Sequence, residues 1–586
     1  MCFFPCSIIH HKNHVNATKG FNDFKPLSSS KSTSMVVYAA EPIVRRSANY
    51  EPSLWSFDHI QSLSSKYTGE DYKARVYSLK KAVKMMIPKV VPNPLNCLEL
   101  VDNLQRLGVS YHFEEEINHV LDMIYGNYFE TREQWNGMDM NLKALGFRLL
   151  RKRGYHVPQE IFGDVKHKIE NVQGDIDVVG MLNLYEASYL SFENEIILDG
   201  VRDFTAKFLK ENVDKIDRKS HLWSLVSHAL ELPLHWRVPR VEAKWFIETY
   251  KETINPTLMD LAILDFNMVQ AIYLQDLKYS SRWWRNTCWD KKLSFCRDRL
   301  VENFLWTVGV NYLPKFSLGR KTLTKVNAII TTIDDVYDVY GTLNELQKFT
   351  DVTIRWNINE IEELPDYMKI CFLGFHNTIN EIAYDNLTNT GLHILPYLKN
   401  AWTDLCKSYL VEAKWYQSGH TPTLQEYLDN GYISISAPAI LMHCNFLTSM
   451  TSTQEILQCM ERTDNIVRYS SLLLRLADDL GTSSDEIARG DNPKSIQCYM
   501  NESGATEDEA RSYIQSLIIK TWKKLNKEVA SVAPYQHLQE FVDCATNLGR
   551  MAQFMYDEGD DGHGRPTISK SRILSLLLNP IQELQN

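Results

Sequence analysis

The chain has 586 residues, a formal net charge of −10 and a hydrophobic content of 44%. This length predicts two domains, or one domain with a large appended one, because it exceeds what a single hydrophobic core usually supports. The negative charge, without a concentrated stripe of Lys and Arg, excludes a nucleic-acid partner, and no apolar run approaches the roughly 20 residues of a membrane span. The 11 cysteines include no CxxC pair, so we expect reduced thiols rather than disulfides or a structural zinc site.

Residues 1–44 have the composition of a targeting segment. Asp23 is the only acidic residue among the first 40, which also hold four lysines and a hydroxyl-rich cluster at 28–34. This bias is typical of an organelle transit peptide, although the arginines that such peptides favour are missing before Arg45. A disordered tail is the alternative. An export signal is disfavoured because the apolar stretch 2–9 lacks a basic segment before it.

From about residue 49 onward the chain has the pattern of an all-helical protein. Apolar residues recur at spacings of three and four along segments such as 97–107 and 241–250, and alternating strand patterns are rare. The helical pattern breaks around Asn255-Pro256, and every acidic cluster suited to catalysis follows this break. We therefore predict an all-α protein whose second helical domain carries the active site, with the segments 1–44, 45–255 and 256–586.

The apolar segment 329–338 ends in three carboxylates. Since each helical residue advances about 100°, Asp334 and Asp338 share one helix face while Asp335 points more to the side. Two such carboxylates beside an apolar stretch repel each other unless cations hold them. Mg²⁺ typically binds one or two carboxylates and completes its octahedron with substrate phosphates and water. Asp334 and Asp338 are therefore candidate metal ligands.

A second acidic cluster lies at 478–486. Asp478, Thr482 and Glu486 are spaced four residues apart, so their oxygens lie along one helical stripe and can share a further ion. Either cluster alone is equally compatible with a solvated helix face. Two clusters of oxygen ligands in one helical domain favour a site for diphosphate and Mg²⁺.

Cations are also required, because a diphosphate leaving group develops negative charge that must be stabilised during ionisation. The candidates are Arg297 and Arg299 in the segment 296–299, and Arg475, which precedes Asp478 by three residues on the same helix face. Lys494 is a further candidate beyond the second cluster. A surface salt bridge is the alternative for each arginine.

Together these residues resemble the plant terpene synthase family from Arg45 to the C-terminus, with the angiosperm monoterpene synthases as the most similar branch. Asp334, Asp335 and Asp338 match the family's DDxxD motif, and 478–486 matches every specified position of its second metal motif. The RDR element at 297–299 and the pair Arg45-Arg46 followed by Trp55 after eight residues also match. The acid motif DxDD of class II cyclases is absent.

The resemblance implies an N-terminal relict α-barrel, a C-terminal class I terpenoid synthase fold and plastid localisation. It also implies three Mg²⁺ ions, with Mn²⁺ as an alternative, a prenyl diphosphate substrate and a monomer. Arg297, Arg299 and Arg475 would draw off diphosphate, and Trp306 and Tyr556 would line a pocket for the allylic cation, with Tyr337 and Tyr340 as further candidates. The expected substrate-binding residues are Arg297, Asp334, Asp338, Arg475, Asp478, Lys494 and Asn327.

Product identity rests on fewer residues. Asn327 and Leu474 occupy positions where isoprene synthases of this branch carry Phe, so the resemblance implies a ten-carbon substrate, geranyl diphosphate. Asn327 could also place a water for capture of the cation. We expect a cyclic product such as α-terpineol, 1,8-cineole or limonene, ahead of acyclic linalool, myrcene or ocimene. The break at 434–438 could aim carbonyl dipoles at the cation, or be a plain structural kink.

Three other readings remain open. A sesquiterpene synthase acting on farnesyl diphosphate shares every metal motif and is disfavoured by the transit-like segment and the Arg45-Arg46 element. A chain-elongating prenyl synthase would carry two DDxxD motifs in a shorter chain. A non-catalytic helical scaffold would explain the acidic runs as solvated faces. One departure from the family, an extra Asp in 559–564, puts closure of the loop over the pocket in doubt.

Overall fold

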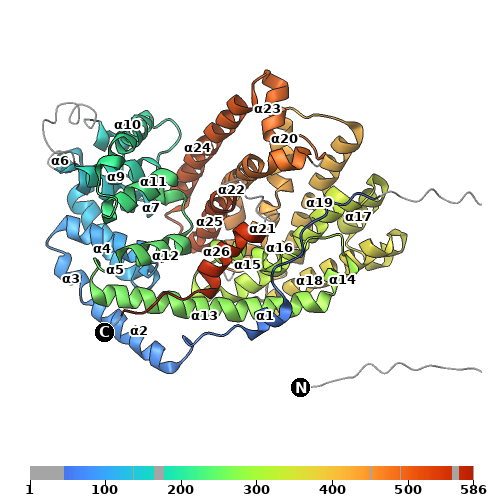
Figure 1. Cartoon of the computed structure of the whole chain (residues 1–586), viewed down its shortest axis with the longest axis horizontal. Helices are drawn as coiled ribbons and strands as arrows, with labels where there is room; N and C mark the ends of the chain where they lie inside the picture. Colours follow the sequence, from blue (N-terminus) through green and yellow to red (C-terminus); the bar gives the residue numbers. More distant parts are fainter. Residues whose placement is uncertain are drawn as a thin grey trace, which may run out of the picture. The chain divides into compact units, whose positions relative to one another are not determined.

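The computed structural model describes residues 45–135, 138–163, 177–448, 452–488, 490–556 and 566–584. Within these ranges the regular structure is entirely helical, as the sequence predicts (Figure 1). Residues 1–44, assigned to the transit peptide, and the segment 559–564 with its extra Asp lie outside the described residues. Residues 45–586 form one compact unit, which contains both predicted helical domains.

The first half of this unit runs from α1 to α12. Its α-helices are α1 (Phe57–Ser62), α2 (Glu70–Lys84), α3 (Ile87–Val90), α4 (Pro94–Arg106), α5 (Glu114–Ile124), α6 (Arg132–Trp135), α7 (Met140–Lys152), α9 (Val178–Ser188), α10 (Ile196–Asn212), α11 (His221–Glu231) and α12 (Pro239–Tyr250). Short 3₁₀ or π turns are η1 (Ser110–His112), η2 (Tyr125–Phe129), η3 (Gln159–Phe162), η4 (Val213–Lys215) and η5 (Leu234–Trp236).

The second half runs from α13 to the C-terminus. Its α-helices are α13 (Pro256–Thr287), α14 (Trp289–Lys292), α15 (Leu300–Val310), α16 (Ser317–Asp335), α17 (Leu343–Arg355), α18 (Asp366–Thr390), α19 (Leu395–Ser418), α20 (Leu424–Ser434), α21 (Ala437–Asn445), α22 (Thr453–Ala488), α23 (Ser495–Ser503), α24 (Glu507–Val532), α25 (Gln539–Tyr556) and α26 (Pro566–Ile573). The short turns are η6 (Pro314–Phe316), η7 (Val336–Tyr340), η8 (Ile358–Glu363), η9 (Gln536–Leu538) and η11 (Leu574–Leu578).

Local sequence signals explain several of these helix boundaries. Asn255 accepts hydrogen bonds from the first backbone N–H groups of α13, and Pro256 occupies the first helical position, where its missing N–H costs nothing. The predicted break between the halves is therefore a helix start. Helices α17, α20 and α24 each begin with a Thr and a Glu three residues into the helix, which form reciprocal capping boxes.

The two halves share one hydrophobic core rather than two separate ones. The indoles of Trp236 and Trp522 stack with centroids 5.6 Å apart. Beside them, the Asn526 amide donates hydrogen bonds to the backbone carbonyls of Tyr189 and Ser191 at 2.9 and 3.1 Å. The boundary near residue 255 thus stays a prediction about domain organisation, because contacts between the halves are continuous.

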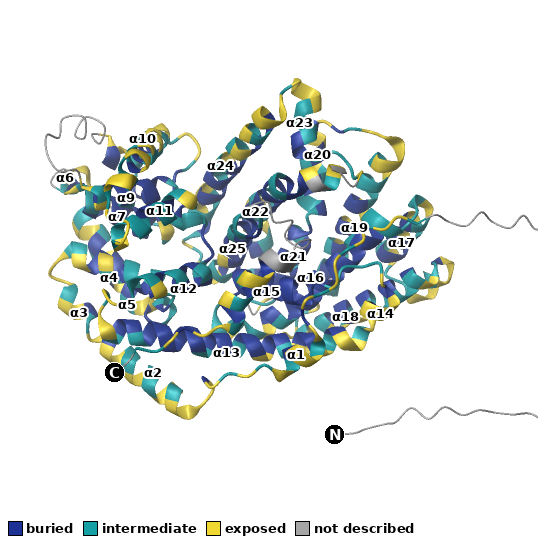
Figure 2. Ribbon diagram, viewed as in Figure 1, coloured by how far each residue is buried: buried dark blue, intermediate teal, exposed yellow. Residues whose placement is uncertain are grey.

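Helices inside the unit, such as α15, are buried along their whole length, whereas α2 at its edge is largely exposed (Figure 2). Helix α13 is long and apolar enough to cross a membrane, but 78% of its most apolar window is buried inside the protein. It is therefore the kind of helix that forms the core of a folded domain. Helices α15, α16, α21, α22 and α25 pack against one another and contribute residues to one cavity, which positions the candidate site.

Candidate active site

A cavity of about 330 Å³ opens among the helices of the second half. Its volume lies at the lower end of the range of roughly 300–1,000 Å³ found for small-molecule sites. It combines an acidic mouth with an apolar interior. The lining includes these predicted site residues: Arg297, Trp306, Asn327, Asp334, Asp338, Arg475, Asp478, Thr482, Glu486, Lys494 and Tyr556.

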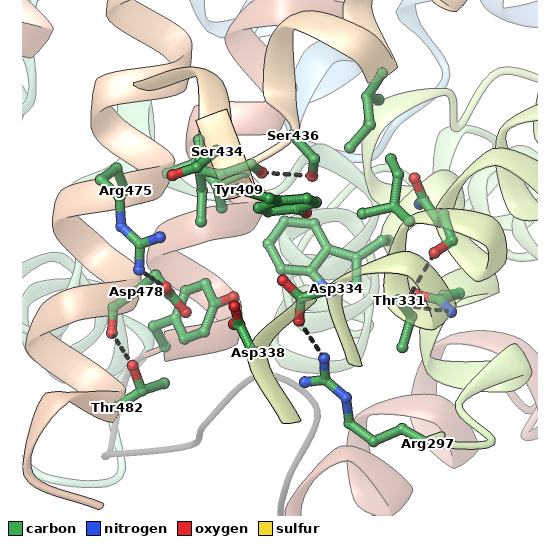
Figure 3. Close-up of a pocket in the computed structure, with 18 of the residues that line it drawn as sticks. Arg297, Thr331, Asp334, Asp338, Tyr409, Ser434, Ser436, Arg475, Asp478 and Thr482 are labelled. Atoms are coloured by element: carbon green, nitrogen blue, oxygen red, sulfur yellow. Dashed lines mark hydrogen bonds and ion pairs between the residues drawn. The ribbon is translucent and has the colours of Figure 1, made fainter. Parts of the chain in front are cut away.

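The first acidic cluster lies where a helix changes its winding. Asp334 is in the last turn of α16, and Asp338 is in the π turn η7 that follows. Such π turns are often found at functional sites. The change from α to π winding was not predicted, yet both carboxylates still face the cavity (Figure 3).

Asp335 has a different place from its neighbours. Asp335 is fully buried. Its carboxylate accepts a hydrogen bond from the Arg297 backbone N–H at 2.7 Å and forms an ion pair with Arg297 Nε at 2.9 Å. The other side of the same guanidinium contacts Asp334. Asp335 therefore holds Arg297 in position rather than facing the cavity, in keeping with its expected sideways direction.

The second cluster repeats this arrangement on α22. Asp478, Thr482 and Glu486 all line the cavity, and the Thr482 hydroxyl donates to the Asp478 carbonyl at 2.9 Å. Arg475 contacts Asp478, and its Nε donates to the buried Asp479 at 2.8 Å. In Figure 3 Asp478 and Thr482 lie across the cavity from Asp334.

Buried contacts fix Asp479 from two further directions. The Tyr427 hydroxyl donates to Asp479 Oδ1 at 2.9 Å, and the Ser495 N–H donates to Asp479 Oδ2 at 3.1 Å. Asp479 is 0% exposed. Each tandem aspartate pair thus consists of one carboxylate facing the cavity and one that anchors an arginine.

The electrostatics of the cavity favour bound cations. Burial, followed by the nearby Asp334 charge, raises the pKa of Asp338 well above its usual range. Burial likewise raises the pKa of Asp478 to about 7, despite the opposing effect of Arg475. Ionised carboxylates are costly in such a site unless cations compensate them.

The set of donor atoms fits a hard divalent cation. Both clusters place carboxylates at the cavity, and the second cluster adds the Thr482 hydroxyl. Oxygen ligands of these kinds suit Mg²⁺. Among the described residues, no three carboxylate, His or Cys side chains converge closely enough to hold an ion by themselves. This agrees with the way Mg²⁺ is usually bound, through one or two carboxylates and the phosphates of a substrate.

Beyond the acidic mouth the cavity is mostly apolar. Trp306 and Tyr556 both line it, with ring centroids 6.0 Å apart, and Leu474 and Ile440 extend the apolar wall. Asn327 is 9% exposed, and its side-chain oxygen has no hydrogen-bond partner among the described residues. Because Asn327 lines the cavity, this unpaired acceptor is a candidate partner for a water or a ligand hydroxyl.

The predicted break at 434–438 forms another part of the wall. Helix α20 ends at Ser434 and α21 begins at Ala437, while Ser436 adopts a left-handed conformation with φ of 67°. Such a conformation is unfavourable for a non-glycine residue and tends to occur at functional sites. Ser434 and Ser436 both line the cavity.

Sequence reasoning missed two lining residues on α19. Tyr409 and Glu412 face the cavity (Tyr409 is labelled in Figure 3). The Glu412 carboxylate accepts hydrogen bonds from the Ser434 hydroxyl at 2.5 Å and the Asn430 amide at 3.0 Å, so it ties α19 to the end of α20. No motif marks them, because their helix reaches the site only through tertiary packing.

The segment 45–51 also reaches the cavity, which its use as a marker of the mature N-terminus did not predict. Ala48, Asn49, Tyr50 and Glu51 line the cavity. Arg45 anchors the start of the segment through a two-pronged ion pair with Glu345 at 2.8 and 2.9 Å.

Three aromatic or cationic candidates lie elsewhere. Arg299 is buried and is not among the lining residues. Tyr337 is also not among the lining residues, and its hydroxyl shares a hydrogen bond with the Thr350 hydroxyl at 2.7 Å. Tyr340 stacks on Phe295 at 3.8 Å between ring centroids. The described structure therefore brings together the predicted metal ligands, Arg297, Arg475 and Lys494, but not Arg299.

Known proteins share this arrangement. A family model described as "Terpene synthase, N-terminal domain" matches residues 54–230, and one described as "Terpene synthase family, metal binding domain" matches residues 285–524. The chain belongs to the terpene synthase family. As a terpene synthase it is a lyase that acts on prenyl diphosphates, and the predicted family is confirmed.

Individual terpene synthases match almost the whole chain. An R-linalool synthase of Artemisia annua, described as chloroplastic, is 63% identical over 96% of this chain and 100% of its own length. The structure of a limonene synthase with 2-fluorolinalyl diphosphate has a TM-score of 0.87 at 42% identity, covering 92% of this chain and 100% of that one.

An isoprene synthase from grey poplar leaves, in complex with three Mg²⁺ ions and dimethylallyl-S-thiolodiphosphate, gives a TM-score of 0.80. It is 40% identical and covers 91% of this chain and 100% of that one. These likenesses confirm the predicted all-α class I terpene synthase fold.

Proposed function

We propose that this terpene synthase is a plastid monoterpene synthase that ionises geranyl diphosphate with Mg²⁺ and captures the ten-carbon cation with water. The observation that carries the proposal is the single cavity that joins two acidic clusters and two anchored arginines to an apolar interior. Similarity to a chloroplastic R-linalool synthase at 63% identity supports the ten-carbon substrate, the plastid location and an alcohol product.

Five side chains would hold the metal: Asp334, Asp338, Asp478, Thr482 and Glu486. Three ions are proposed, as in the isoprene synthase complex, with Mn²⁺ as an alternative. When bound, the ions neutralise the diphosphate and make it a better leaving group.

The cations of this chain would bind the leaving diphosphate. Arg297 and Arg475 are held at the cavity by Asp335 and Asp479, so their guanidinium groups need little reorganisation to meet negative charge. Lys494 also lines the cavity, and its Nζ lies 3.4 Å from Glu486 Oε2. Their combined charge stabilises diphosphate as the bond to carbon breaks.

The apolar interior would stabilise the allylic cation. The faces of Trp306 and Tyr556 attract a cation without offering it a nucleophile. Asn327 supplies a side-chain oxygen without a hydrogen-bond partner among the described residues, and this oxygen would orient a water for attack on the cation. One water adds, one proton leaves, and the products are a C10 alcohol and diphosphate.

Two alcohols fit this chemistry. Attack before ring closure yields linalool, which the similarity to the Artemisia annua enzyme favours. Attack after ring closure yields α-terpineol, the kind of cyclic product expected from the sequence. Both require the same water, so we propose a tertiary alcohol with linalool as the first candidate.

The proposal is tested by expressing residues 45–586 and offering geranyl, farnesyl and dimethylallyl diphosphates separately with Mg²⁺. Chiral gas chromatography identifies the product, and a reaction in ¹⁸O-water shows whether its oxygen comes from solvent. We expect a labelled C10 alcohol from geranyl diphosphate. Hydrocarbons without alcohol would contradict water capture, and turnover of farnesyl diphosphate alone would contradict the ten-carbon substrate.

The metal assignment has its own variants. Asp338→Ala and Glu486→Ala are each expected to lower kcat by about 100-fold or more, comparable to the loss of a main electrostatic contact in other active sites. Asp351→Ala, at an exposed position of α17, is the matched control. Near-normal turnover in both site variants would refute the assignment.

A further inference from the structure

The two arginines of the RDR element have different surroundings. Arg297 lines the cavity, whereas Arg299, two residues later, is 1% exposed and lies behind the wall. Arg299 Nη2 donates to the backbone carbonyl of Glu51 at 2.7 Å, and Nη1 donates to the carbonyl of Asp298 at 3.0 Å. The guanidinium is thus engaged with the N-terminal segment.

Two carboxyl groups next to Arg299 in the chain also interact with it electrostatically. Glu302, one turn along α15, is 0% exposed, and burial raises the pKa of its carboxyl while the Arg299 charge opposes that effect. Asp298 is a second carboxylate beside Arg299. The buried indole of Trp55 also lies beside Glu302. To bind diphosphate, Arg299 would have to break its hydrogen bonds to the backbone carbonyls of Glu51 and Asp298, which is costly for a buried charge.

The carbonyl that Arg299 binds belongs to the segment that covers the cavity. Residues 48–51 line it, and Asn49 turns the chain with a φ of 50°, a conformation that Asn tolerates better than most residues. Beyond this turn the Tyr50 ring lies 5.0 Å from the Arg297 guanidinium. Arg299 therefore holds the chain at Glu51, next to Tyr50, and the Tyr50 ring contacts the guanidinium of Arg297.

We propose that Arg299 is a positioning residue that fixes residues 48–51 over the cavity and, through Tyr50, orients Arg297, rather than a direct ligand of diphosphate. The inference rests on the proposed function and changes the role expected for the second arginine of this element. It also predicts that Arg299 governs how much water reaches the cation, because the segment forms part of the cavity wall.

Hydrogen exchange tests the anchoring without any turnover. In the chain 45–586, we expect amide exchange in the peptide 47–55 to be at least about tenfold faster in Arg299→Gln than in wild type, with Arg299→Lys intermediate. Arg282→Gln, an exposed arginine of α13, is the matched control. Arg299→Lys keeps the positive charge at this position, and a melting temperature close to that of wild type is the check that it folds. Unchanged exchange in both Arg299 variants would overturn the proposal.

Binding of inorganic pyrophosphate with Mg²⁺, measured by calorimetry, separates the two roles of arginine. We expect Kd to change less than about threefold in Arg299→Lys and to rise at least about tenfold in Arg297→Lys. An equal loss of affinity in both variants would overturn the proposal. Neither measurement requires product formation, so failure of the proposed function would be distinguishable from failure of this inference.

Discussion

At the scale of single residues, the two aspartates of each tandem pair have different roles. Asp334 and Asp478 face the cavity, while Asp335 and Asp479 each bind the Nε of an arginine. An arginine held on one side presents its remaining donors in a fixed direction, which suits a planar fork that binds phosphate oxygens. The second aspartate therefore contributes to diphosphate binding without touching it.

Asp479→Asn tests this division. The amide cannot accept from Arg475, Tyr427 and the Ser495 N–H together, so at least one buried donor loses its partner, at a cost of about 1–3 kcal/mol. We expect kcat/KM for geranyl diphosphate to fall about 10- to 100-fold as Arg475 loses its orientation. Steady-state kinetics with varied diphosphate substrate measures this.

The matched control is Asp429→Asn, which removes the partner of Arg468 in an exposed pair at 2.8 Å. Exposed pairs contribute little, so its kinetics should be those of wild type. If Asp479→Asn were equally silent, the anchoring role would be wrong.

At the same scale, motif matching assigned residues unequally. Spacing along one helix places Asp478, Thr482 and Glu486 on a common stripe regardless of their surroundings, and the cavity contains all three. The roles of Arg297 and Arg299 could not be separated this way, because they lie in the irregular segment before α15. Glu412 had no local signal at all.

At the scale of elements, α21 shows how a polar side chain is accommodated in a buried helix. His443 is buried, and its Nδ1 is hydrogen bonded to the Ala439 carbonyl at 2.8 Å one turn earlier. Burial lowers the pKa of His443 to about 4, so the ring is neutral in the folded protein at physiological pH. This helix carries Ile440 to the cavity wall.

The lowered pKa of His443 predicts a pH-dependent contribution to stability. Between its ordinary pKa of 6.5 and the folded value of about 4, the unfolded chain binds a proton that the folded chain does not. The free energy of unfolding therefore falls as pH falls, by about 1.4 kcal/mol per unit from this group, and is unaffected by it above that window.

We expect the stability advantage of wild type over His443→Gln to shrink by about 3 kcal/mol between pH 7 and pH 4. Urea unfolding at several pH values measures this difference. The effect of Met442→Leu, in the same helix and without a titrating group, should not depend on pH. A difference that stayed constant or grew on acidification would show that His443 is not the proton-linked group.

At the scale of the whole molecule, the halves on either side of residue 255 are joined by specific polar contacts as well as by a shared core. Asn526 of α24 makes three of them, donating to the Tyr189 and Ser191 carbonyls and bonding to a His235 ring nitrogen at 2.8 Å. The catalytic half therefore depends on the other half for burial of α24.

Asn526→Ala is expected to lower the free energy of unfolding by about 2–4 kcal/mol, because it leaves buried carbonyls without donors. We also expect unfolding by urea to remain a single transition, since one core spans both halves. Asn212→Ala is the control, because the hydrogen bonds of its side-chain amide in the described structure are local: it donates to the Phe208 carbonyl and accepts from Lys215 Nζ, both at 2.8 Å. Two separated transitions in Asn526→Ala would show that the halves fold independently.

What the sequence by itself determined was local: the helical period, the caps, and the two stripes of oxygen ligands, because spacing along one helix decides which side chains share a face. The α20–α21 break was also predictable from its proline. Only the tertiary structure decided that the acidic residues of α16 and α22 meet across one cavity. It also decided that Glu412 of α19 and residues 48–51 line that cavity. Those contacts join positions far apart in the chain, and no local pattern encodes which distant helices pack together.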